Sequence, residues 1–471
     1  MNINDTCNYV CAALPSYTQH SAGTLKENPD YINEKNLYDF TQANVNKFLS
    51  SYGIALIRGR KIDAKLNKRY QKTFDFFYNK SYMKDCEFII DSGGFQVQME
   101  YLQTKEDTNI MIKMYHEFLL ENWEKFKYAF VLDLAPGPTS CIYDSFAEME
   151  NYNHISYEAS ANLPEKTRDK MMWIHHFRTT SLNNLWSKML FEENLADKFK
   201  NFATGGLVSS SGGKRPPIVL YTIPLISILT HAKSRNLKKF RFHILGGSEW
   251  KDLIFHKLAE IHIKKCHDID VTITYDSSTI FKLLAMSRCT FLQSEIGKLW
   301  KISVKSSHLD KVHPELGNHK EAFFKHLNDA VTPYGMKPLD VNTYSMYDGE
   351  SGQHTFNTNN TGKMTRLVYQ YGILHLLKLY ADMDAFSSRM AKEIYPLYES
   401  GNVIEFDMRV TGIMKNLNNG KISKRLRSKS NTIYNSLKEL EQMDLTKMSY
   451  IIDQTMTDDE VFGTHKQPTK F

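Results

Sequence analysis

The stretch EFIIDSGGFQ, residues 87–96, is a short apolar run that ends in an acid, a serine and two glycines. Residues 107–126, DTNIMIKMYHEFLLENWEKF, have apolar positions three and four apart, which predicts a helix. A second apolar run, YAFVLDL (128–134), follows directly. This strand–helix–strand order is typical of a parallel sheet, whose strands are joined by helical crossovers.

The same alternation continues through the first two thirds of the chain. The other predicted strands are IALIRG (54–59), MMWIHHF (171–177), FATGGLV (202–208), FRFHILGG (240–247), VTITYD (271–276) and TFLQSEI (290–296). About eight such units fit a closed barrel better than an open doubly wound sheet. CNYVCAALP (7–15) is either an additional strand or the first one.

The character of the sequence changes after about residue 305. YDGESGQHTFNTNNTGK (347–363) is polar and reads as a long loop, and helical periodicity follows it. We therefore predict an α/β fold: a (β/α)8 TIM-type barrel over residues 1–304 and a mainly helical C-terminal region over residues 305–471.

Composition narrows the class of protein. The 471 residues are 42% hydrophobic and 24% charged, as in globular proteins and unlike disordered or fibrous ones. The most apolar segment, which begins at Pro216, contains prolines and is shorter than the roughly 20 apolar residues of a membrane span. The N-terminus does not resemble a secretory signal, so we expect a cytoplasmic protein without membrane contact.

Six cysteines in so long a chain do not make a disulfide framework. Cys7 and Cys11 have no partner pair at metal-ligand spacing. We expect both to be ordinary strand residues.

The net charge of +6 has the sign that suits a polyanionic partner. Two segments, RNLKKFR (235–241) and KISKRLRSK (421–429), concentrate positive charge. One such cluster is more often a solvated helix face, but two together favour nucleic acid. The expected nucleic-acid-binding residues are Lys421, Lys424, Arg425, Arg427 and Lys429.

Polar residues gather where the predicted strands end, which in a barrel is where active sites lie. They are Asp91 and Ser92, Asp133, His175 and His176, Gly205 and Gly206, Gly246 and Gly247, and Asp276. Any one of these residues alone is common in a turn after a strand. Several carboxylates buried together lower the stability of the fold unless they are paired or serve a function, so the group as a whole indicates a site.

Three acids at one mouth fit glycosidic chemistry, in which one carboxylate attacks the anomeric carbon and another moves protons. They also fit a divalent metal site. Backbone N–H groups of the GGL turn at 205–207, together with an aspartate, match the Watson–Crick edge of guanine. Phe95 could stack on a flat base.

Five motifs now suggest a family. DSGGFQ (91–96), FVLDLAPG (130–137), ATGGLV (203–208), HILGGSEWKDL (243–253) and YDSST (275–279) resemble, in order and approximate spacing, motifs of the queuine and archaeosine tRNA-guanine transglycosylases. The resemblance covers roughly residues 85–290, and its first motif is the most specific.

The resemblance implies a base exchange on an intact polynucleotide. By position, Asp276 is the nucleophile at C1′ and Asp91 is the general acid and base. The residues that the resemblance assigns to the base are Asp133 for N1–H and the amine, Ser92 beside it, Phe95 for stacking, the Gly205–Gly206–Leu207 turn with the Gly206 amide on O6, and Ile244 or Leu245 on the other face.

Two features differ from the tRNA enzymes. WIHHFRTT (173–180) puts His176 where those enzymes carry a glutamine, and the cysteine cluster of their zinc site is absent because the last cysteine is Cys289. We therefore expect no cofactor. This pattern resembles the DNA 7-deazaguanine transglycosylases of bacteriophages and bacterial modification islands. If the chain is encoded by a phage, the expected location is the host cytoplasm. The predicted reaction replaces guanine in DNA by a 7-deazaguanine base such as the 7-cyano form.

Three alternatives remain open. The chain could be a true tRNA-guanine transglycosylase with an unusual C-terminal region. It could be a non-catalytic subunit that binds nucleic acid, although such a subunit should have lost one of its acids. It could also be a metal-dependent barrel hydrolase that uses Asp91, Asp133, His176 and Asp276.

Overall fold

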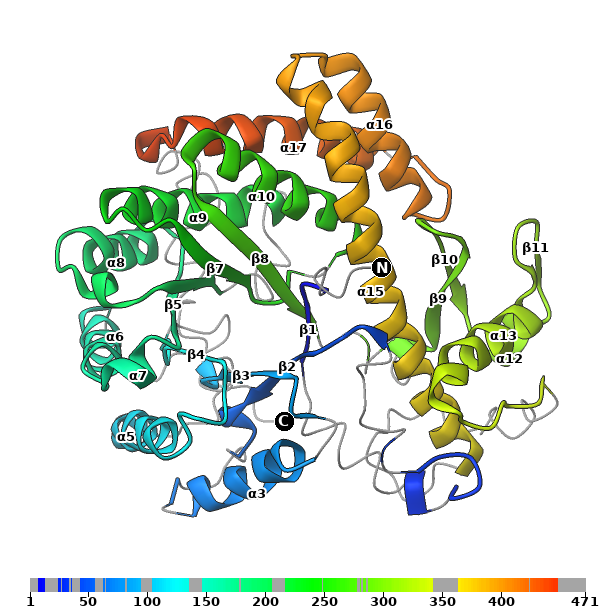
Figure 1. Ribbon diagram of the computed structural model, residues 1–471, viewed down its shortest axis with the longest axis horizontal. Coiled ribbons are helices and arrows are strands. Elements are labelled where there is room, and N and C mark those ends of the chain that lie inside the picture. The colour runs from blue at the N-terminus through cyan, green and yellow to red at the C-terminus, as the bar shows by residue number, and fades with distance from the viewer. Residues whose placement is uncertain are drawn as a thin grey trace, which may run out of the picture.

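Eight parallel strands form a closed barrel in the computed structural model (Figure 1). They are β1 (Tyr9–Cys11), β2 (Lys47–Ser51), β3 (Glu87–Asp91), β4 (Tyr128–Phe130), β5 (Met171–His175), β6 (Asn201–Thr204), β7 (Lys239–Ile244) and β8 (Asp270–Ser277). Each strand pairs with the next along the chain, and β1 pairs with β8 to close the ring, with Val10 opposite Asp276. The predicted (β/α)8 barrel is confirmed.

The structure describes most of the chain. The described residues are 7–12, 24–26, 28–33, 35, 43–55, 62–63, 65–80, 83–94, 104–134, 146–177, 179–205, 217–247, 249–277, 280, 283–284, 287–341, 363–422 and 424–447. The predicted loop at 347–363 lies outside them except for its last residue, Lys363, which begins a helix.

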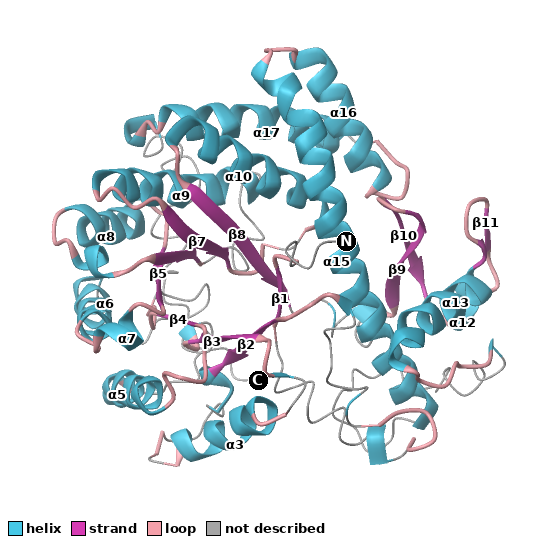
Figure 2. Ribbon diagram, in the orientation of Figure 1, coloured by secondary structure: helices cyan, strands magenta, loops and turns pink. Residues whose placement is uncertain are grey.

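Helices surround the barrel on its outside (Figure 2). They are α3 (Leu66–Tyr78), α5 (Lys105–Glu121), α6 (Phe146–Ala161), α7 (Glu165–Arg168), α8 (Thr180–Phe191), α9 (Pro217–Ser234) and α10 (Leu253–His267). Local sequence sets where two of them begin. Thr104 and Asp107 form a reciprocal capping box at α5, and the Thr179 hydroxyl accepts from the Leu182 N–H at α8.

Two predicted strands were wrong. The second barrel strand is β2 and not residues 54–59; Tyr52–Ala55 instead forms a 3-10 turn. Residues 290–296 belong to β9 (Cys289–Glu295), which pairs antiparallel with β10 (Lys298–Ser303) outside the barrel. The missing eighth strand is β1, so the segment at 7–15 supplies the first strand.

Side chains alternate between the barrel interior and the layer under the helices. The interior apolar layer consists of Val10, Ala12, Leu49, Ile89, Phe130, Met172, Ile174 and Ala203. Below it, towards the amino ends of the strands, Arg241 donates to Glu87 at 2.7 Å and lies 4.3 Å from the Tyr128 ring centre. This pair and the apolar layer fill the barrel, so only its carboxyl end is available for a site.

The C-terminal region is mainly helical, as predicted. After the β9–β10 hairpin come α12 (Ser306–Leu309), β11 (Val312–His313), β12 (Gly317–Asn318), α13 (His319–Val331), α15 (Lys363–Glu399), α16 (Val403–Asn416) and α17 (Lys424–Gln442). The long helix α15 packs on α10, and α17 lies along α9 and α10 (Figure 1). One hydrophobic core runs through both parts of the chain.

Helix α15 is fastened to the seam where β1 meets β8. The buried Asp384 carboxylate accepts from the Asn8 N–H at 3.2 Å and from the Tyr275 hydroxyl at 3.0 Å. Lys257 of α10 lies 3.3 Å from the same carboxylate. The rings of Tyr9 and Tyr380 stack at 4.1 Å. The seam is therefore completed by the C-terminal region.

Two smaller expectations also concern the fold. Cys7 and Cys11 are free thiols buried at or next to β1, in line with their prediction as strand residues. Across the described helices, none has the length and apolar content that crossing a bilayer requires.

Candidate active site

The alternation along the strands brings four predicted residues to the carboxyl mouth of the barrel. Asp91, His176, Gly205 and Asp276 each lie two positions beyond a residue that faces the interior. Asp133 follows β4 on the neighbouring segment. The charges of Asp133 and Asp276 both act on Asp91, so the three carboxylates share one mouth.

Asp91 is the last residue of β3 and is half-buried. Its carboxylate accepts from the Ser51 hydroxyl of β2, and its Oδ1 lies 3.4 Å from the Gly93 N–H. Gly93 has φ of +91°, a conformation that side chains disfavour. Burial, with the nearby charges of Asp133 and Asp276, raises the pKa of Asp91 to about 6. A carboxyl group with this pKa can exchange protons near neutral pH.

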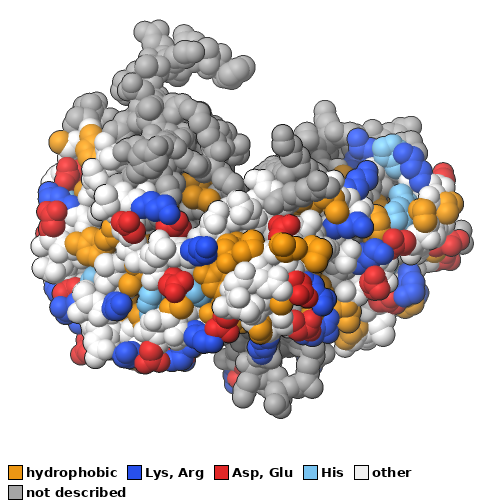
Figure 3. Space-filling view, turned by 90° about the horizontal axis from the view of Figure 1, so that it is seen from above, with side chains coloured by type: hydrophobic (Ala, Val, Ile, Leu, Met, Phe, Trp, Pro, Cys, Tyr) orange, Lys and Arg blue, Asp and Glu red, His pale blue; other side chains and the backbone are white. Residues whose placement is uncertain are grey.

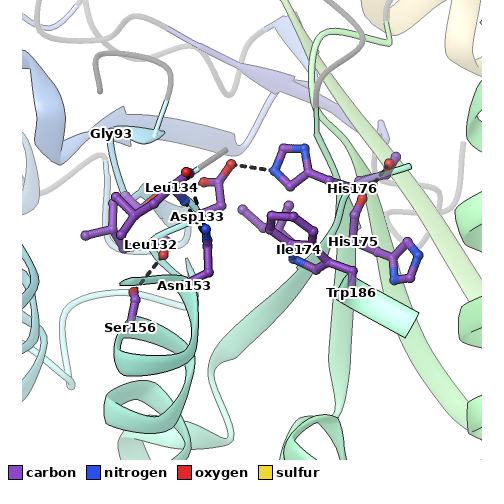
Figure 4. Close-up of polar contacts among 12 residues, drawn as sticks. Gly93, Leu132, Asp133, Leu134, Asn153, Ser156, Ile174, His175, His176 and Trp186 are labelled. Atoms are coloured by element: carbon purple, nitrogen blue, oxygen red, sulfur yellow. Dashed lines mark hydrogen bonds and ion pairs between the residues drawn. The ribbon is translucent and has the colours of Figure 1, made fainter. Parts of the chain in front are cut away.

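Asp133 is held by a helix behind it (Figure 4). Asn153 of α6 accepts from the Leu134 N–H at 2.9 Å, and the Ser156 hydroxyl donates to the Leu132 carbonyl at 2.7 Å. The second glycine of the DSGG motif makes room for Asp133. A Cβ on Gly94 would lie 2.3 Å from Asp133 Oδ1 and 2.7 Å from its main-chain oxygen.

His176 points at Asp133, and its Nε2 lies 2.7 Å from Oδ2 (Figure 4). A carboxylate only accepts when it is ionised, so in that state Nε2 carries the hydrogen of this bond. The imidazole rests on Trp186 of α8, 4.8 Å away between ring centres. Gly205 is required beside it, because a Cβ there would lie 2.9 Å from the ring.

His175 does not belong to the mouth. It occupies the opposite face of β5, where its Nε2 lies 3.4 Å from Asn183 of α8 and it is fully buried. Burial lowers the pKa of His175 to about 3, so the ring is neutral. Only one of the two adjacent histidines faces the carboxylates.

Asp276 lies near the end of β8, and one of its oxygens has two donors. Oδ1 accepts from the Gly246 N–H at 2.8 Å and lies 3.2 Å from Nε2 of His243. Gly246 has φ of +77°, a conformation that favours glycine at this position. A Cβ on Gly247 would lie 2.3 Å from Ile244, so both glycines after β7 have a steric reason.

The basic run at 421–429 is only partly available to a polyanion. Lys421 is exposed, as expected. Lys429 was wrongly expected to face nucleic acid: it is 7% exposed, and its Nζ binds Glu249 at 2.9 Å and also Asp252. Because both partners follow β7, this lysine fastens α17 to the barrel. Across the described part of the face in Figure 3, basic and acidic side chains are interspersed.

Several predicted residues lie outside the described part of the chain: Phe95, Gly206 and Leu207, together with the side chains of Lys424, Arg425 and Arg427. No known protein family, curated protein or solved structure matches this chain. The chemistry of the site therefore has to be inferred from its own residues.

Three site residues were missed from the sequence: Ser51 on Asp91, Trp186 under His176, and His243 on Asp276. Of these three residues, only His243 could have been predicted from the sequence, by the alternation of side chains along its strand. It alternates with the apolar Phe242 and Ile244, which face the helices, so it must face the interior. Among the residues that the structure describes, no three His, Cys, Asp or Glu side chains are grouped as metal ligands.

Proposed function

We propose that the protein is a glycosyltransferase that exchanges guanine in DNA for a 7-deazaguanine base through a covalent intermediate on Asp276. The observation that carries this proposal is the difference between two carboxyl groups at one mouth. Burial raises the pKa of Asp91 to about 6, whereas Asp276 accepts two hydrogen bonds on one oxygen. When two neighbouring carboxyl groups have such different surroundings, one can carry protons while the other acts as the nucleophile. Here Asp91 would carry the proton and Asp276 would attack.

The proposed reaction has two displacements. Asp276 attacks C1′ of the target nucleotide, the C1′–N9 bond breaks, and the leaving guanine takes the proton of Asp91. The incoming base then returns a proton to Asp91, its N9 attacks C1′, and the bond to Asp276 breaks. Two displacements retain the configuration at C1′. The target nucleotide must first leave the duplex stack, at a cost on the order of a few kcal/mol.

Asp133 and His176 are suited to hold the base. Each Asp133 oxygen has one partner, Nε2 of His176 on Oδ2 and Ser92 on Oδ1, and each keeps a lone pair that can accept from N1–H or the exocyclic amine of a guanine-like base. The Ser92 hydroxyl lies 3.5 Å from the same Oδ1 and supports it. A buried acceptor rejects bases that lack these donors, because its lone pairs would be left without partners.

The choice of DNA over tRNA is supported by two sequence features. The cysteines of the tRNA enzymes' zinc site are absent, and His176 stands in place of their glutamine. Neither feature involves the two catalytic acids, so polymer and reaction are tested separately.

The deciding experiment is nucleoside mass spectrometry of DNA and of tRNA after incubation with the protein and 7-cyano-7-deazaguanine. We expect the modified nucleoside in DNA, its loss in Asp276→Asn and Asp91→Asn, and its retention in the exposed control Asp85→Asn. Modification of tRNA alone would identify the tRNA enzyme instead. Modification of neither polymer would refute base exchange, and loss of activity with a chelator would favour the metal-dependent hydrolase.

A further inference from the structure

We infer that His243 is a positioning residue for Asp276: it donates to one carboxylate oxygen and so fixes which oxygen attacks. This inference rests on the proposed function for its catalytic meaning. His243 lies in β7, is fully buried in the barrel interior, and packs 5.1 Å from the Phe130 ring centre. The resemblance to the transglycosylases assigns no role to this position.

The hydrogen bonds of the imidazole determine where its hydrogen lies. Nδ1 is 2.9 Å from the Thr274 hydroxyl, and Nε2 is 3.2 Å from Asp276 Oδ1. The hydroxyl can donate or accept, whereas an ionised carboxylate only accepts. Nε2 therefore carries hydrogen when Asp276 is ionised, whichever way the Thr274 hydroxyl is turned.

These contacts make the two oxygens of Asp276 unequal. Oδ1 has two donors, the Gly246 N–H and Nε2 of His243. Oδ2 has no hydrogen-bond partner among the described residues of the site. A free lone pair is what attack on C1′ requires, so Oδ2 is the nucleophilic oxygen and Oδ1 anchors the group.

The hydrogen bond from His243 to Asp276 also bears on the repulsion between the carboxylates of Asp91 and Asp276. Among the described residues, the titratable groups that interact with Asp276 include His243 from β7, Asp91 from β3 and Tyr9 from β1. Two neighbouring carboxylates disfavour each other's ionisation, and hydrogen-bond donors favour it. Because burial raises the pKa of Asp91 to about 6, Asp91 is suited to hold the proton that the first displacement needs.

Two substitutions separate the hydrogen bond from mere filling of space. Gln places an amide N–H near the position of Nε2, so His243→Gln should retain exchange to within about tenfold. His243→Leu removes the donor and should lower kcat about ten- to a hundredfold, the effect of one hydrogen bond to a charged group. It should also move the acidic limb of the kcat/KM profile up by about one pH unit.

His256→Leu is the matched control. His256 is also a fully buried histidine and lies on α10 outside the barrel, and neither of its ring nitrogens has a hydrogen-bond partner within the described part of the chain. Exchange by this variant should equal that of the wild type. If His243→Leu kept the wild-type pH profile, or if Gln and Leu were equally harmful, the positioning role would be overturned.

A measurement without substrate separates this inference from the proposed reaction. Nitrogen-15 NMR of histidine-labelled protein, with the His243 signal assigned from the His243→Gln spectrum, reports which ring nitrogen carries hydrogen. We expect protonated Nε2 at neutral pH and a changed signal in Asp276→Asn. An unprotonated Nε2, or a signal indifferent to Asp276→Asn, would overturn the pairing. The expected spectrum with no exchange in either polymer would uphold the pairing and refute the reaction.

Discussion

Asparagine at position 91 should stabilise the protein at neutral pH while abolishing base exchange. Burial, with the charges of Asp133 and Asp276, raises the pKa of Asp91 from 3.8 to about 6. Between these values the folded protein holds a proton that the unfolded chain has released, so the free energy of unfolding falls as the pH rises through this window. At about 1.4 kcal/mol per pH unit, the full cost is about 3 kcal/mol and is reached above about pH 6.

Urea denaturation from about pH 4 to about pH 8 measures this cost. Asp91→Asn should exceed the wild type by up to about 3 kcal/mol at the alkaline end, and the gain should vanish at the acid end, where Asp91 is protonated. Asp85→Asn, an exposed change just before the same strand, controls for the loss of one charge. The reasoning fails if Asp91→Asn is no more stable than the wild type at pH 8, or if its advantage does not depend on pH.

Alanine at Gly94 should lower the free energy of unfolding by about 1–3 kcal/mol, because its Cβ would lie 2.7 Å from a main-chain oxygen that cannot rotate away. Gly412 lies within α16, and a Cβ there would have nothing within 4 Å, so Gly412→Ala should raise the free energy of unfolding by about 0.5–1 kcal/mol in the same assay. If both alanine variants were destabilised, or both stabilised, this reasoning would be wrong. Lys429→Met should cost about 3–5 kcal/mol, because the buried Asp252 loses its cation while Glu249 keeps Lys251, yet leave polynucleotide affinity unchanged in an anisotropy titration. Reversal of Lys424 and Arg425 to glutamate should weaken polynucleotide binding and flatten its salt dependence; unchanged binding would make this run a solvated face.

The sequence predicted those strands whose inward and outward faces are both apolar. β3 and β5 read as continuous apolar runs because helices cover their outer face and the barrel core covers the inner one. β2 was missed because its sequence, KFLSS, carries polar residues that the barrel satisfies internally: Lys47 donates to the Cys7 carbonyl at 2.6 Å, and the Tyr70 hydroxyl donates to Ser50. Such partners are distant in the chain and leave no local pattern.

The candidate site shows the same limit. Asp91, Asp133 and Asp276 could be recognised because each follows an apolar run and barrel strands end at one mouth. What each acid binds could not be predicted, since pairs such as His176 with Asp133 depend on side-chain direction in three dimensions. Lys429 shows the error that follows from this limit. Its place in a basic run is typical of a phosphate ligand, yet its partners are acidic residues about 180 positions earlier in the chain.

The seam between β1 and β8 has a consequence for synthesis of the protein. β1 has three residues, and the Asn8 N–H beside it donates to Asp384 of α15, 376 residues later in the chain. Until that helix emerges, the ring lacks the carboxylate and the stacked tyrosine that cover its seam. A barrel that closes between β1 and β8 before α15 has been synthesised therefore has an uncovered seam, which other chains can contact.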